Sequence, residues 1–175
     1  MAEFSETIPL VQIIQRRIKM IHFKIDKHAV AFPSKLLAQT GGAHQYNIEL
    51  TEDRDNGTLV GRGQFLDIDL YKQAAVPKFE GMIRKKAKNG NWYVEVTAPT
   101  DALWIYEPVV IAEEGMKEFQ DDHNFYNPKG GVVDGYELHV GDTFEVSVEN
   151  FEGTPAPDTK VTGTAAGLYK VAATA

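Results

Sequence analysis

The side chains of this chain that could bind a metal are its histidines and one group of acids. The histidines are His22, His28, His44, His123 and His139, and no two of them have the short spacing of a zinc site. Between Glu114 and His123 four carboxylates lie close together and could hold a hard cation. Acids on a short exposed helix are common, however, and no Glu-x-x-His or His-x-x-x-His pattern accompanies them. We therefore predict no metal site and no cofactor.

Residues for nucleophilic catalysis or phosphate binding lack the motifs that such chemistry requires. The chain has no cysteine, which excludes thiol chemistry and disulfide bonds. No serine lies in a Gly-x-Ser-x-Gly elbow, and Gly61-Arg62-Gly63 is too short for a phosphate-binding loop. The acidic turn Asp53-x-Asp55-Asn56-Gly57 departs from a calcium loop, because its glycine is fifth rather than sixth. We predict that the protein is not an enzyme.

The strongest candidate for binding is a basic segment followed by aromatic residues. It comprises Arg84, Lys85, Lys86 and Lys88, with Trp92 and Tyr93 after them. Cations beside aromatic rings are typical of single-stranded nucleic-acid grooves, although lysines near a hairpin tip also discourage edge-to-edge strand pairing. The net charge of −7 is unusual for a nucleic-acid binder. We predict that this segment contacts an acidic protein neighbour, and we expect no nucleic-acid partner.

Charge is distributed unevenly along the chain. Residues 1–40 hold six lysines and arginines and three acids, whereas residues 101–150 hold two lysines and twelve acids. A basic beginning and an acidic later half can attract a second copy head to tail or bridge surfaces of opposite sign. The alternative is that the acidic half is a solvated face that maintains solubility. A homo-oligomer is therefore one arrangement to consider.

No segment has the pattern of a membrane span or of an export signal. A run of about 18 apolar residues is absent. Residues 1–20 carry acids before the pair Arg16-Arg17, whereas a signal peptide begins with positive charge. We expect no membrane partner and no export.

Alternating apolar residues and turn signals predict that strands position these side chains. Tyr46, Ile48 and Leu50 alternate with polar residues, as half-buried strands do. The pairs Asn56-Gly57 and Asn89-Gly90 predict two hairpins, because Asn-Gly favours the type I′ turn. Gly61 and Gly63 indicate a bulge or a close backbone approach.

Two further segments add to the predicted strands. Residues 102–111 are nearly all apolar, which predicts a strand buried on both faces, and residues 161–171 predict a last short hairpin. We predict a mainly β fold: an antiparallel β-barrel or β-sandwich with an N-terminal arm and at most one or two short helices.

Three regions are expected along the chain. Residues 1–22 form an N-terminal arm or a first core element, residues 23–128 form the main β domain, and residues 129–175 form a C-terminal hairpin or barrel portion of the same or a separate domain. The arm is apolar and basic, which is typical of a segment that docks on a neighbour. Its contact candidates are Ile13, Ile14, Arg16, Arg17 and Ile18.

One stretch carries a family resemblance. Residues 135–147 contain two alternating segments separated by Val140-Gly141-Asp142, and they are followed by Gly153-Thr154-Pro155 and a closing Gly167–Val171. This stretch resembles the small β-barrel end of capsid auxiliary proteins of tailed bacteriophages, in which a final hairpin completes the barrel. The resemblance covers roughly residues 130–175 and implies no catalytic or cofactor residue.

The resemblance implies a virion protein that binds capsid subunits as an auxiliary, decoration or head-stabilising protein. Its partners would be the major capsid protein or other virion proteins, and it would be located in the capsid, or in the host cytoplasm before assembly. One alternative is a tail or head–tail connector component. The other is an acidic single-stranded-DNA binder with an oligonucleotide-binding barrel, for which a salt-dependent shift of oligo-dT would be diagnostic.

Overall fold

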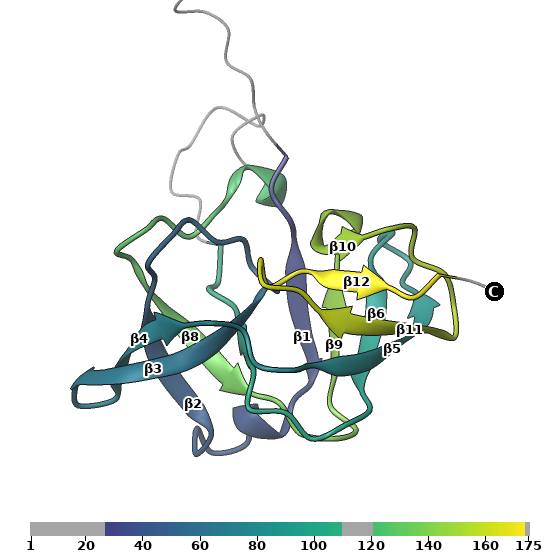
Figure 1. Cartoon of the computed structure of the whole chain (residues 1–175). Helices are drawn as coiled ribbons and strands as arrows, with labels where there is room; N and C mark the ends of the chain where they lie inside the picture. Colours follow the sequence, from purple (N-terminus) through teal and green to yellow (C-terminus); the bar gives the residue numbers. More distant parts are fainter. Residues whose placement is uncertain (1–26, 110–120, 174–175) are drawn as a thin grey trace, which may run out of the picture.

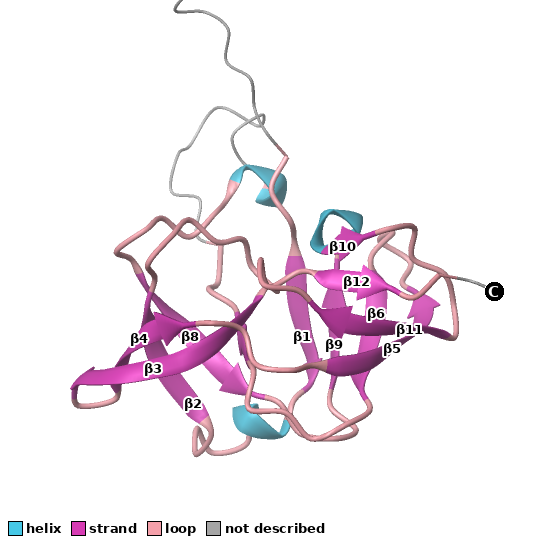
Figure 2. Ribbon diagram, viewed as in Figure 1, coloured by secondary structure: helices cyan, strands magenta, loops and turns pink. Residues whose placement is uncertain are grey.

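The computed structural model describes residues 27–109 and 121–173. Within these ranges the chain forms strands and three single-turn 3-10 segments, at Leu37–Gln39, Asp122–Asn124 and Val148–Asn150 (Figure 2). The predicted mainly β fold is confirmed. None of the described segments is a helix with the length and hydrophobicity needed to cross a membrane.

Five strands close into a small barrel, at the left of Figure 1. In order around the barrel they are β2 (Gln45–Glu49), β4 (Leu70–Ala74), β3 (Leu59–Asp67), β7 (Leu103–Ile105) and β8 (Val132–Glu137). Strand β2 runs parallel to β4, and the other pairs are antiparallel. The buried apolar side chains of one cluster fill the barrel: Ile48, Leu50, Val60, Leu103, Ile105 and Val133.

The remaining seven strands form a curled sheet. Their order is β1 (Ala31–Lys35), β9 (Thr143–Val146), β6 (Trp92–Val96), β5 (Glu80–Lys86), β11 (Thr159–Gly163), β12 (Tyr169–Val171) and β10 (Phe151–Glu152). The predicted closing hairpin is present as β11 and β12, but it belongs to this sheet and not to the barrel. The strands of residues 129–175 enter both assemblies, because β8 lies in the barrel and β9 lies in the sheet.

Barrel and sheet share one aromatic core. Of the apolar run 102–111 that was predicted to be a strand buried on both faces, only Leu103–Ile105 forms a strand, β7, and all three of its residues are buried. Residues 106–109 follow it without strand structure and are partly exposed, and residues 110–111 lie outside the described residues. Leu103 and Ile105 point into the barrel, whereas Trp104 belongs to the larger cluster with residues of the sheet. The Trp104 ring lies 5.3 Å from Phe144 of β9, between centroids, and Phe144 in turn lies 5.6 Å from Tyr169 of β12.

One of the two predicted Asn-Gly hairpins is wrong and the other is confirmed. Asn89-Gly90 does connect the antiparallel strands β5 and β6. Asn56-Gly57 connects β2 to β3, but these strands do not pair, because β2 pairs with β4 and β8. Asn56 is also only 2% exposed. Its turn lies inside the molecule, where its hydrogen bonds go to residues distant in sequence and not to a hairpin partner strand.

The buried turn residues Asn56 and Gly57 join elements from both assemblies. The Asn56 side chain donates to the carbonyl of Glu107 at 2.8 Å and accepts from its amide at 2.9 Å. The side-chain amide of Asn127 donates to the same Asn56 side-chain oxygen, and the side-chain amide of Asn150 donates to the backbone carbonyl of Asn56. Buried polar groups need such partners, since an unpaired one costs about 1–3 kcal/mol.

Tyr169 of the sheet completes this junction. Its hydroxyl donates to the Gly57 carbonyl at 2.6 Å, and the Gly57 amide donates to Ile105 of the barrel. The Tyr169 side chain is fully buried, and burial raises the pKa of its phenol well above the ordinary value. The hydroxyl therefore stays protonated and remains a donor.

The two Asn-Gly turns provide a matched test of this arrangement. Gly57 and Gly90 both have positive φ, at 82° and 95°, so alanine is strained at either position. A β-carbon at Gly57 would lie 2.6 Å from the Ala31 β-carbon, whereas one at Gly90 would meet nothing within 4 Å. We expect Gly90→Ala to lower the free energy of unfolding by about 1–2 kcal/mol. We expect Gly57→Ala to lower it by about 3 kcal/mol or more, or to prevent folding.

Urea unfolding followed by tryptophan fluorescence measures both values. Equal losses of stability in the two variants would mean that both turns are exposed hairpin turns, and would contradict the buried junction.

Candidate functional site

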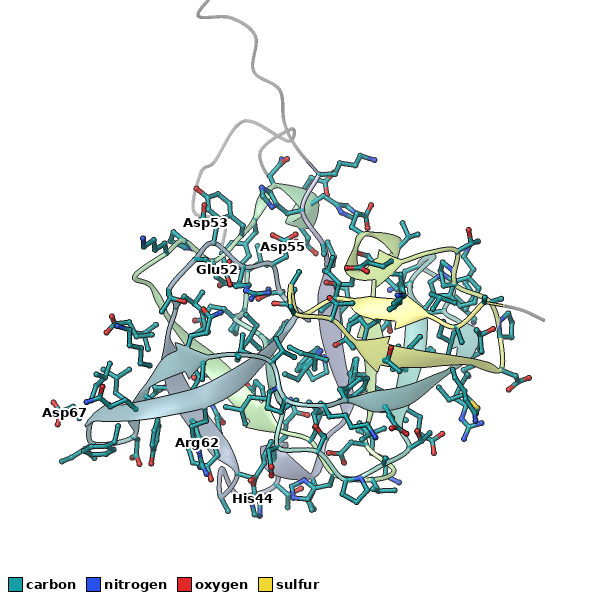
Figure 3. The ribbon with its side chains drawn as sticks, in the orientation of Figure 1. His44, Glu52, Asp53, Asp55, Arg62 and Asp67 are labelled. Atoms are coloured by element: carbon teal, nitrogen blue, oxygen red, sulfur yellow. The ribbon has the colours of Figure 1, made fainter. Side chains whose placement is uncertain are left out.

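A hairpin that projects from the barrel exposes three large apolar side chains. Strands β3 and β4 form this hairpin, whose end reaches outward at the left of Figure 1. Phe65, Leu66 and Ile68 are 57%, 41% and 83% exposed, respectively. Asp67 lies at the same end and points into solvent in Figure 3. We call Phe65, Leu66 and Ile68 the hairpin tip.

Behind the hairpin tip, aromatic rings and one arginine form a continuous row. Phe65 meets Tyr71 edge to face at 5.6 Å between centroids, and Tyr71 meets Tyr46 in the same way at 5.6 Å. The Arg62 guanidinium lies over the Tyr46 ring at 4.4 Å and near the Tyr71 ring at 5.4 Å. Cation–π and edge-to-face contacts of this kind hold the rings in place.

Local sequence explains why this hairpin can bend away from the barrel. A β-carbon at Gly61 would lie 2.1 Å from the Ala75 carbonyl oxygen, and one at Gly63 would lie 2.5 Å from that of Lys72. The predicted close backbone approach is therefore confirmed. The register of the β3–β4 pairing shifts twice between Arg62 and Asp67. Such irregularities increase the local twist of a strand pair. Asp69 closes the turn with a φ of 58°.

The predicted basic segment lies on the β5–β6 hairpin, but its charges are partly engaged. The Arg84 guanidinium donates to the Glu95 carboxylate at 2.5 Å. The Lys85 amine lies over the Tyr93 ring at 5.3 Å, and the Lys86 amine over the Trp92 ring at 5.7 Å.

These lysines, together with Lys88, line a shallow hollow at the end of the β5–β6 hairpin. Tyr93 and Glu145 complete its wall. Glu145 accepts hydrogen bonds from the side chains of Asn89 and Asn91, and its charge raises the pKa of the Tyr93 phenol. A carboxylate in the hollow disfavours a nucleic-acid backbone there, because the two are of like charge. Trp92 is half-buried and packs against the larger apolar cluster that contains Trp104.

The predicted contact residues of the arm lie outside the described residues. These are Ile13, Ile14, Arg16, Arg17 and Ile18. Of the predicted contact residues, the structure therefore places Arg84, Lys85, Lys86, Lys88 and Trp92, and it brings them together on one hairpin.

Sequence reasoning missed the hairpin tip and a second cluster. Phe65 and Ile68 continue the apolar content of the segment, which by itself does not indicate exposure, although the interleaved Asp67 and Asp69 were a signal for a projecting turn. The second cluster consists of His44, Glu137 and His139, whose ligand atoms all lie within 4.8 Å of one another. His44 and Glu137 are far apart in sequence, so the spacing of histidines could not reveal this group.

Comparison of the chain with protein-family models, with curated proteins and with solved structures gave no match. Its function must therefore be inferred from the surfaces described above.

The Arg84–Glu95 pair on the β5–β6 hairpin predicts a pH effect. The hydrogen bond from Arg84 is the main cause that lowers the pKa of Glu95 below its ordinary value. Because the folded-state pKa is lowered, the pair stabilises the fold above the ordinary pKa of a glutamate, and this contribution is lost as pH falls through the folded-state pKa. We expect Arg84→Gln to return the pKa of Glu95 toward its ordinary value.

NMR titration of the side-chain carboxyl signals measures this pKa. Lys85→Gln is the control, because it removes the positive charge of a neighbouring residue whose amine lies over the Tyr93 ring and not beside Glu95. A Glu95 titration that is identical in wild type and Arg84→Gln would show that the pair does not persist in solution.

Proposed function

We propose that this chain is a non-catalytic structural protein of a tailed-bacteriophage particle, which binds capsid subunits as an auxiliary or decoration protein. The observation that carries the proposal is the exposed hairpin tip with its supporting aromatic row. The resemblance of residues 130–175 to capsid auxiliary proteins supplies the identity of the partner. The same surface would serve a tail or connector component, for which the partner would be a ring of fixed stoichiometry.

The composition of the hairpin surface favours a protein partner. Tyrosine and arginine are enriched among residues that dominate binding energy, and charged residues are depleted at interface centres. The Arg62 guanidinium already packs on the rings of Tyr46 and Tyr71, so these side chains would lose little conformational entropy on binding. The tip residues would then enter an apolar pocket on the partner and bury their exposed area.

Two unlike surfaces at opposite sides of the molecule suit a protein that bridges neighbours on a lattice. Strands β3 and β4 lie at the left of Figure 1, and β5 and β6 lie at its right. One surface is apolar and aromatic, and the other carries Lys85, Lys86 and Lys88. On a capsid, where sites repeat, modest contacts at each surface add through effective concentration.

Binding of single-stranded DNA is less well supported by the geometry. Base stacking needs free ring faces, whereas lysine amines lie over Tyr93 and Trp92. Glu145 places a negative charge in the same hollow.

Sedimentation of purified virus particles tests the virion role. We expect the chain to remain with intact particles at a constant ratio to the major capsid protein. Its absence from particles, or a shift of oligo-dT by the purified chain at about 50 mM salt, would overturn the proposal.

Adding the chain back to particles that lack it tests the docking surface. Phe65→Ser/Ile68→Ser removes two apolar side chains that contact solvent, so the fold should be kept while affinity for the particles falls about tenfold or more. The control is Val132→Ser/Val148→Ser, in which two other exposed apolar residues, 51% and 53% exposed, are changed. If the tip variant binds as tightly as the control, the hairpin tip is not the docking surface.

A further inference from the structure

Three potential metal ligands meet at one end of the barrel. His44 directly precedes β2, and its carbonyl accepts a hydrogen bond from the Glu137 amide at the end of β8. Side chains alternate along an extended strand, so Glu137 and His139 share the face opposite to buried Leu138. Antiparallel pairing therefore places His44 beside both of them. Figure 3 shows His44 at the lower end of the barrel.

The distances between these side chains are close to those of a metal site. His44 Nδ1 lies 2.6 Å from a Glu137 carboxylate oxygen, and the rings of His44 and His139 lie 5.0 Å apart between centroids at 74°. Ligand atoms around a tetrahedral zinc ion are separated by about 3.3 Å, given bonds of about 2.0–2.1 Å. The 2.6 Å contact therefore has to open by about 0.7 Å, while His139 moves inward.

A second carboxylate lies behind His139, as is usual for histidines that bind metals. Asp142 is almost buried and accepts hydrogen bonds from the amides of Leu37 and His139. Its carboxylate lies 3.7 Å from His139 Nδ1, an inner atom that makes no hydrogen bond within the described residues. If the His139 ring moved closer, so that Nδ1–H donated to Asp142, Nε2 would be left unprotonated, which is the tautomer that coordinates a metal.

We propose that His44, Glu137 and His139 form a binding site for a first-row divalent transition metal ion, with Zn²⁺ as the best fit. Two imidazoles and one carboxylate suit zinc, and they provide too few oxygens for Ca²⁺. The ion replaces the proton that His44 and Glu137 share in their hydrogen bond. The three side chains are 41%, 30% and 35% exposed, so the fourth position faces solvent and is open to water or to a ligand from a neighbouring protein. This site is independent of the hairpin tip.

Isothermal titration calorimetry tests the proposal: ZnCl₂ is added to the full chain in a buffer without phosphate, and the heat of binding is measured. We expect one ion per chain, reversal by EDTA, and no heat with CaCl₂. His44→Gln, Glu137→Gln and His139→Gln should each weaken binding at least about tenfold. His123→Gln is the matched control, since its imidazole contacts the His28 carbonyl at another place in the fold.

NMR of the histidine ring nitrogens in wild type keeps the test valid if a variant fails to fold. Signals of His44 and His139 should shift with Zn²⁺ and stop shifting at one equivalent, while those of His28 and His123 should stay in place. No zinc binding by wild type, unchanged affinity in the folded ligand variants, or zinc shifts at other histidines would overturn the site.

Discussion

A single buried turn fixes the barrel to the curled sheet. The side chain of Asn56 and the carbonyl of Gly57 lie among groups from both assemblies, and each of their polar atoms has a partner there. If the two assemblies separated without unfolding, these groups would be left unpaired in an apolar setting. Trp104 reinforces the same joint from the barrel side, because its ring packs against Phe144 of the sheet. The hydrogen bonds of the turn and the aromatic contacts of Trp104 thus join the barrel and the curled sheet into a single folded unit.

The rigidity of this joint determines what the surfaces of the protein can do. The β3–β4 hairpin and the β5–β6 hairpin extend from opposite sides, so a fixed joint also fixes the distance between an apolar surface and a basic one. A rigid spacer loses little entropy when both ends bind at once. The His44 cluster lies on a third part of the surface, where one end of β2 and one end of β8 meet; Glu137 is the last residue of β8, while His44 directly precedes β2 and His139 follows β8.

Features set by neighbouring residues could be predicted from the sequence, and features set by distant ones could not. The run at Leu103–Ile105 gives a strand buried on both faces because its own hydrophobicity requires it. Asn89-Gly90 and Asn56-Gly57 have the same local signal, and what separates them is the presence of Asn127 and Asn150 beside Asn56. The basic hairpin could be found from the sequence because its residues are close together in the chain. The His44 cluster could not, because it depends on the pairing of β2 with β8, which are far apart in sequence.

Hydrogen exchange of backbone amides tests the buried joint most directly, because it measures the opening free energy of each part of the fold. If the turn makes barrel and sheet one cooperative unit, core amides such as Ile48 and Val60 in the barrel will exchange with the same opening free energy as Val94 and Phe144 in the sheet, equal to that of global unfolding. A barrel that opens at distinctly lower free energy while the sheet stays protected would show two independent units, and would contradict the joint.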